Sequence, residues 1–156
     1  PGDVVDVAFQ PQINEFRGER SVQLNILDIR PHCSCPCSPD SSLHRRLRTG
    51  TLTPAEAQQL TPSRQVLGAV WRYLAGCDSQ TIQETPICLC RKVVRRSGLE
   101  MDAGMLLTCL DIFSDVDLIQ MHRMNKYLQI RLNTIDGKAD LQQSSTLQRL
   151  LQLKES

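Results

Sequence analysis

The first clear hydrophobic pattern in the chain is a pair of alternating runs near its N-terminus. Apolar residues alternate with polar or small ones over 5–9 and again over 22–26. A period of two predicts strands with one buried face. Leu27 and Ile29 continue the second run on the other parity, which predicts a strand end covered on both faces. With turn-forming residues over 14–18, residues 1–31 predict a β-hairpin.

An isolated two-stranded hairpin is only marginally stable in water. We therefore expect residues 1–31 to be the terminal strands of a larger β-domain and the chain to be a fragment of a longer protein. The apolar face of the hairpin would be covered by the rest of the chain or by a second copy. Pairing of two copies along the exposed hairpin edge would give a dimer.

Residues 32–60 break the pattern. Proline, serine and cysteine are frequent there, and periodicity is weak except for one short helical stretch over 43–52. Such a composition is typical of loops. We expect a linker or insertion between the hairpin and a C-terminal domain over 61–156.

From residue 61 onward the hydrophobic spacing becomes that of helices. Residues with good capping chemistry delimit three of them. The expected helices run from Thr61 or Ser63 to Gly76, over 86–97 with Gly98 closing, and from Asp102 to about Phe113.

Alternating runs over 118–122 and 127–132 then predict a second hairpin, and leucines spaced along 144–154 predict a last helix. Three helices, a hairpin and a further helix follow the order of a winged helix-turn-helix with a C-terminal extension. The predicted fold class is therefore α+β: a partial β-domain followed by a winged-helix-like domain.

Composition limits the functional classes. The 156 residues carry a formal net charge of +1, so no overall affinity for polyanions is expected. No apolar run approaches the roughly 20 residues that span a bilayer. The cysteines number seven, an odd and irregularly spaced set, which predicts reduced thiols in a cytoplasmic protein rather than a disulfide framework.

Two stretches of the chain are similar to one known family. The first hairpin resembles the end of the oligonucleotide-binding (OB) domain in the RecJ family of single-strand-specific DNA exonucleases. The residues that carry this likeness are Asn14, Gly18, Gln23, Leu24 and Asp28. The stretch 110–119, followed by 137–141 and Ser144, looks like the C-terminal domain that follows that OB domain in many bacterial members.

The resemblance implies a parent enzyme that degrades single-stranded DNA from its 5′ end in repair and recombination. It also implies manganese or magnesium, bound by an Asp-His-His motif in upstream catalytic domains. The histidines of this chain, His32, His44 and His122, are not adjacent to one another, so no catalytic or metal residue is carried over. This chain alone should not hydrolyse DNA and needs no cofactor. It would position single-stranded DNA or dock a partner such as single-strand-binding protein or another repair protein.

The loop between the last two strands of an OB fold commonly contacts oligonucleotides. The resemblance places that loop at 14–20. The candidate nucleic-acid-binding residues are Asn14, Phe16, Arg17 and Arg20: Phe16 for stacking on a base, the arginines for phosphate. Two acidic residues in the same loop oppose phosphate binding, and a purely turn-forming role is the alternative.

A second candidate is the basic run at the end of the expected helix 86–97. Arg91, Lys92, Arg95 and Arg96 would lie on its solvent side and contact a phosphate or an acidic partner. Their position near a helix C-terminus, where the dipole favours positive charge, explains them equally well without any ligand.

The third helix would read the major groove in a DNA-binding winged helix and would need cations or amides on its outer face. The expected outer residues are instead Asp102, Thr108, Asp111 and Ser114, followed by Asp115 and Asp117. Acidic residues repel the duplex, so we expect this helix not to read DNA. A winged-helix transcription factor is therefore only the alternative function.

The cluster His32, Cys33, Cys35 and Cys37 suggests a zinc site. Its C-x-C spacing differs from the C-x₂-C of structural zinc loops. Cys88 and Cys90, two apart on a helix, point to different faces, and Cys90 and Cys109 fall on apolar stripes. We expect no metal site; a thiol-rich adaptor is the remaining alternative.

Overall fold

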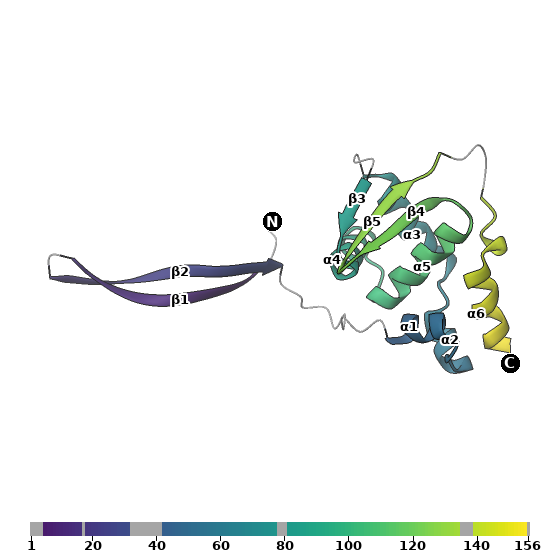
Figure 1. Cartoon of the computed structure of the whole chain (residues 1–156), viewed down its shortest axis with the longest axis horizontal. Helices are drawn as coiled ribbons and strands as arrows, with labels where there is room; N and C mark the ends of the chain where they lie inside the picture. The colour runs from purple at the N-terminus through teal and green to yellow at the C-terminus, as the bar shows by residue number, and fades with distance from the viewer. Residues whose placement is uncertain (1–4, 17, 32–41, 78–80, 135–138, 156) are drawn as a thin grey trace. The chain divides into compact units, whose positions relative to one another are not determined.

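The computed structural model describes residues 5–16, 18–31, 42–77, 81–134 and 139–155. These residues divide into two compact units with the boundary after Pro36. The first contains a two-stranded antiparallel sheet, and the second contains six α-helices and a three-stranded antiparallel sheet. The predicted α+β class is confirmed (Figure 1).

The first unit is a hairpin of β1 (Val5–Phe16) and β2 (Glu19–Pro31). Its strands are longer than the sequence pattern predicts, and the turn is correspondingly tighter. Gly18 has φ +81°, a left-handed conformation that glycine adopts without steric cost. The expected loop over 14–20 is therefore wrong, because residues 14–16 pair with residues 19–21 in the ladder.

A β-bulge explains the mixed parity of apolar residues in β2. The register shifts between Ala8 and Phe9, so that Phe9 pairs with Ile26 and Val7 pairs with Ile29. Paired residues lie on one face of the ladder, and Val7 and Phe9 share a face because they are two apart. Ile26 and Ile29 thus lie on the same face, and the expectation that this strand end is covered on both faces is wrong.

The centre of the second unit has the element order of a winged helix. It consists of α3 (Arg64–Ala75), β3 (Thr81–Glu84), α4 (Pro86–Ser97), α5 (Ala103–Asp115), β4 (Ile119–Met124) and β5 (Tyr127–Leu132). The sheet order is β3-β5-β4. Sequence analysis missed β3, which has only four residues.

Short polar side chains begin these helices where the sequence predicts. Ser63, Thr85 and Asp102 each accept a hydrogen bond from the backbone N–H three residues later. This geometry satisfies one of the N–H groups left unpaired at a helix start. Gly98 ends α4 in the left-handed conformation, with φ +69°.

Three further helices pack beside the winged helix. They are α1 (Ser42–Thr49), α2 (Pro54–Leu60) and α6 (Ser145–Glu155), the last preceded by the short 3₁₀ helix η1 (Leu141–Gln143). Figure 1 shows α1, α2 and α6 together at one end of the unit. They share a small core that includes Leu47, Leu60 and Leu150.

Residues 42–60 are thus part of the helical unit, and the expected linker over 32–60 needs correction there. Two features hid these helices from the sequence pattern. Each has only two buried residues, and α2 depends on a capping box in which Thr53 and Glu56 bond each other's backbone N–H. Residues 32–41 lie outside the described part of the chain. None of the described helices is long and apolar enough to cross a membrane.

Candidate functional site

Helix α5, the helix that would read DNA in a winged helix, is buried along most of its length. Nine of its 13 residues are buried. Helices α3 and α4 and strand β4 of the winged helix pack against it, and α1, α2 and α6 also contact α5. Thr108, expected on the outer face, has no exposed surface, and its hydroxyl donates to the Gly104 carbonyl at 2.9 Å. The outer face predicted for this helix is therefore wrong at Thr108.

Asp111 links α5 to α1. Its Oδ2 lies 2.6 Å from Nε2 of His44, whose side chain is 2% exposed, and its Oδ1 accepts from Arg123 of β4 at 3.5 Å. A buried imidazole needs such a polar partner. Asp111 is accordingly a structural residue that fixes α1 over α5.

Asp115 serves α6 in the same way. Its Oδ2 accepts hydrogen bonds from the Ser144 and Ser145 hydroxyls and from the Thr146 backbone N–H, at 2.8–3.0 Å. Burial alone would raise the pKa of Asp115, but these hydrogen bonds outweigh it and hold the pKa below its ordinary value. The carboxylate thus caps the N-terminus of α6 from a distant part of the chain.

The candidate basic residues of α4 are partly engaged within the fold. Lys92 forms an ion pair with Glu84 of β3, and this hydrogen bond raises the pKa of Lys92. The Arg96 guanidinium lies 6.0 Å from the centre of the Tyr73 ring, within cation–π range. Arg91 and Arg95 also have interactions of their own. All four side chains belong to one helix, but each already interacts with another group of the protein.

The hairpin candidates fall at the tip of β1 and β2. Asn14 pairs with Ser21 in the ladder. The Arg20 Nε lies 3.3 Å from Glu15 Oε2, and both side chains are more than half exposed. The Phe16 side chain and Arg17 lie outside the described residues. Asn14 and Arg20 are the candidates here whose side chains are described; both are exposed, and the Glu15 carboxylate partly neutralises Arg20.

The structure describes some of the cysteines named in the sequence analysis but not others. Cys90 and Cys109 are fully buried in the main core, as their apolar positions predict, and burial raises the pKa of the Cys109 thiol. Cys33, Cys35 and Cys37 lie outside the described residues. Among the residues that are described, no group of three potential ligands is placed to hold a metal ion.

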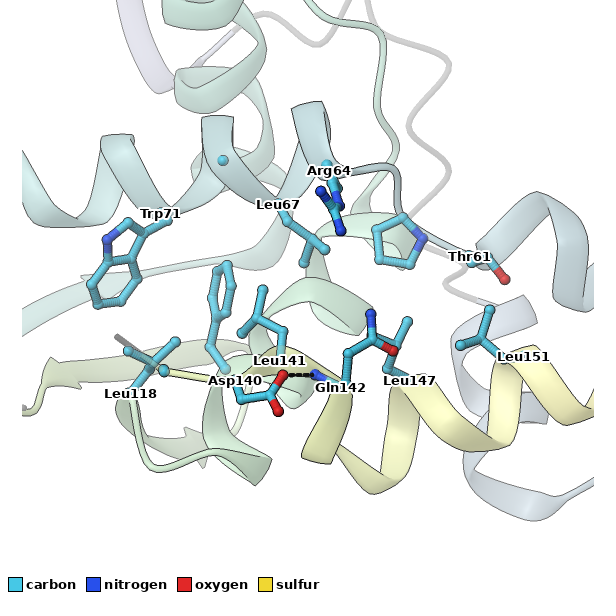
Figure 2. Close-up of a pocket in the computed structure, with 14 residues that line it drawn as sticks. Thr61, Arg64, Leu67, Trp71, Leu118, Asp140, Leu141, Gln142, Leu147 and Leu151 are labelled. Atoms are coloured by element: carbon cyan, nitrogen blue, oxygen red, sulfur yellow. Dashed lines mark hydrogen bonds between the residues drawn. The ribbon is translucent and has the colours of Figure 1, made fainter. Parts of the chain in front are cut away.

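An open groove of about 730 Å³ lies between α3 on one side and η1 and α6 on the other (Figure 2). Its size is within the range of binding pockets, about 300–1,000 Å³. Most of its lining is apolar: Leu67, Trp71, Phe113, Leu118, Leu141, Leu147 and Leu151. Trp71 meets Phe113 edge to face, with ring centres 5.6 Å apart, so the wall at this end is fixed by aromatic packing.

Some polar groups at the groove already have hydrogen-bond partners within the fold, and others have none. Asp140 accepts from the Gln142 backbone N–H and the Gln143 side chain, and the Thr61 hydroxyl donates to the Ala57 carbonyl. Within the described residues, neither the Arg64 guanidinium nor the Gln142 side-chain amide has a partner. One cation and one amide are thus available to a ligand.

Sequence reasoning missed this groove. Trp71 and its neighbours follow an ordinary helical stripe, which predicts core packing. The opposite wall comes from residues about 70 positions later. One local signal was present: Gly68 lies in the interior of α3, where a glycine lowers helix stability.

Three comparisons with known proteins give no match: no family model, no curated protein and no solved structure is similar to this chain.

Proposed function

We propose that this chain is the non-catalytic C-terminal region of a single-stranded-DNA-specific 5′-to-3′ exonuclease of the RecJ type, a cytoplasmic enzyme of DNA repair and recombination. In this proposal the hairpin closes an OB-fold domain, and the helical unit docks a partner or positions single-stranded DNA. Manganese or magnesium and the hydrolytic step belong to catalytic domains elsewhere in the parent enzyme. The chain itself does not hydrolyse DNA.

The observation that carries the docking role is the burial of α5. A winged helix that reads DNA inserts this helix into the major groove. Here α1 and α6 contact it, and Asp111 and Asp115 anchor those two helices. Inserting α5 into DNA would require removing α1 and α6. The order of helices and strands is compatible with the alternative function, a winged-helix transcription factor. The burial of α5 argues against that alternative.

The hairpin supports the OB-fold part of the proposal. The apolar side chains that its bulge aligns on one face are exposed, among them Phe9 (51%), Ile13 (72%), Val22 (71%) and Ile26 (60%). A continuous apolar face of this kind normally belongs to an interface or to a larger sheet. The remaining strands of a barrel would cover it; a second copy paired along the hairpin edge is the competing occupant.

Binding of labelled oligonucleotides, followed by fluorescence anisotropy at low salt, tests the proposal. We expect the chain to bind a single strand more tightly than the duplex of the same sequence. Changing Arg17 and Arg20 to Ala together should weaken single-strand binding, and Lys126→Ala, an exposed cation in the β4–β5 turn, is the matched control. Equal or tighter duplex binding would favour the transcription factor instead. Zinc found by native mass spectrometry would favour the thiol-rich adaptor.

The contribution of the hairpin tip can be isolated further. Glu15 faces Arg20 and repels phosphate, so Glu15→Gln should strengthen single-strand binding if the tip contacts DNA. The quadruple change of Arg91, Lys92, Arg95 and Arg96 to Ala tests the α4 face. If that change alone abolishes binding, the contact lies on α4 and the tip has only a turn-forming role.

A further inference from the structure

We infer that the groove between α3 and η1–α6 binds a peptide segment of a partner protein that combines large apolar side chains with a carboxylate. This inference rests on the proposed docking function and specifies the chemistry of the partner. It uses only residues of the helical unit, so it does not depend on the hairpin.

The apolar lining defines the first half of the ligand. Trp71 and Leu118 lie toward one end of the groove and Leu151 toward the other (Figure 2). Trp71, Leu118, Leu141 and Leu151 are each partly exposed. Covering partly exposed apolar surface is favourable in proportion to its area. A ligand with two or more large apolar side chains is the best match to such a lining.

The charged residues at the rim of the groove define the polar part of the ligand. Arg64 is exposed and has no partner in the described structure, whereas both carboxylate oxygens of Asp140 already accept hydrogen bonds. An incoming carboxylate can pair with Arg64 without displacing an existing bond. The Gln142 amide can both donate to and accept from a peptide backbone. An acidic segment is therefore favoured over a basic one.

Gly68 faces this groove and has no structural requirement for being glycine. A Cβ placed there would meet no atom within 4 Å, and its φ is not in the left-handed region. Alanine at this position would stabilise α3. The absence of a side chain keeps the groove wide along α3, which lets a bound segment approach the helix closely.

The same observations argue against single-stranded DNA as the occupant. Grooves that bind single strands combine stacking side chains with several cations along the backbone path. Among the described lining residues, Arg64 is the one cation, and Asp140 is a carboxylate at the same rim. Its lining is mainly aliphatic.

The test uses the whole chain and a random-peptide display library. Individual selected peptides are then titrated against the protein while tryptophan emission is followed. Trp71 is the single tryptophan of the chain, so the signal arises in the groove. We expect selected peptides to carry an acidic residue close to large apolar ones and to shift the Trp71 emission to shorter wavelength.

Two pairs of variants complete the design. Gly68→Leu fills the groove and should weaken binding by roughly tenfold or more, while Gly68→Ala, which leaves the groove open, should bind like the wild type. Arg64→Glu should weaken binding of acidic peptides, while Lys126→Glu, on the β4–β5 turn, should not. Circular dichroism of each variant confirms that it is folded.

Recovery of no binding peptide, or equal binding by Gly68→Leu and the wild type, would overturn the inference. So would a Trp71 shift caused by oligo(dT), or one that appears with protein concentration alone, since these assign the groove to DNA or to a second copy. Oligonucleotide anisotropy is measured on the same samples. If the peptides fail while preferential single-strand binding persists, only the groove assignment is lost and the DNA-positioning part of the proposed function stands.

Discussion

Helix α5 and the β1–β2 hairpin both contain many apolar residues, which α5 buries and the hairpin leaves exposed. Leu106, Leu110 and Ile112 in α5 have no exposed surface, whereas Ile13 and Val22 in the hairpin are more than two-thirds exposed. The helical unit completes its own core. Within its own unit, the hairpin leaves its apolar face exposed.

This difference indicates that the two units are stabilised in different ways. A unit that buries its central helix is stable by itself and offers function only at its surface, in the groove or on its charged faces. A unit with an exposed apolar face is stabilised by whatever covers that face. Substitutions in the two units should therefore differ sharply in their effect on the free energy of unfolding.

The largest expected effect is in the core around α5. Leu110→Ala should lower the free energy of unfolding of the helical unit by about 2–5 kcal/mol, because it removes a fully buried side chain and leaves a cavity. Urea unfolding followed by Trp71 fluorescence measures it. A change below about 1 kcal/mol would mean that α5 is not packed as described.

The next effect concerns the contact between α1 and α5. His44→Ala should cost about 1–3 kcal/mol, because it removes a buried ring and a hydrogen bond to Asp111. His122→Ala, on the exposed part of β4, is the control and should change stability by at most about 0.5 kcal/mol. Equal effects of the two changes would contradict the burial of His44.

A smaller effect is expected at the start of α6. Asp115→Asn should cost about 1 kcal/mol at neutral pH, the usual size of a lost N-terminal cap. The pKa of Asp115 is lowered in the folded state, so its contribution is complete above the ordinary value of 3.8 and disappears as the pH falls through the folded value.

Unfolding curves of the wild type and Asp115→Asn should therefore converge as the pH is lowered below the ordinary value of 3.8. Asp117→Asn is the matched control, since the Asp117 side chain caps no helix among the described residues and only its backbone carbonyl accepts a hydrogen bond, from Asn133. A constant difference between wild type and Asp115→Asn over that range would show that the carboxylate charge is not what matters.

The smallest effect on unfolding is expected in the hairpin. Ile13→Thr should change the stability of the helical unit by less than about 0.5 kcal/mol, because the residue is exposed and belongs to a separate unit. If a second copy covers the hairpin, the same change should lower self-association in sedimentation velocity experiments. A large loss of helical stability would show that the two units depend on each other.

Much of the winged helix could be predicted because its boundaries are local. Ser63, Thr85 and Asp102 sit immediately before apolar stripes, and Gly98 follows one. The alternation over β4 and β5 is equally local. Such signals depend on a few neighbouring residues, so they can be recognised without knowing the tertiary contacts.

The remaining features depend on residues far apart in sequence. His44 and Asp111 are separated by 67 positions, and neither is unusual in its own neighbourhood. Thr108 is a polar residue, which predicts exposure to solvent. Its hydroxyl instead donates a hydrogen bond to a carbonyl of its own helix, and the side chain is fully buried. The groove is assembled from α3, the end of α5 and the η1–α6 segment, so no single stretch of sequence predicts it.

The bulge in β2 has a consequence for the length of that strand. Leu27 is the residue of β2 without a partner in the ladder, between Ile26 opposite Phe9 and Asp28 opposite Ala8. Deleting Leu27 would restore a regular ladder and leave Ile29 opposite Val7, on the same face as Ile26. Position 27 should therefore tolerate deletion as well as substitution: the bulge takes up one residue, so that two differently phased halves of one strand face the same way.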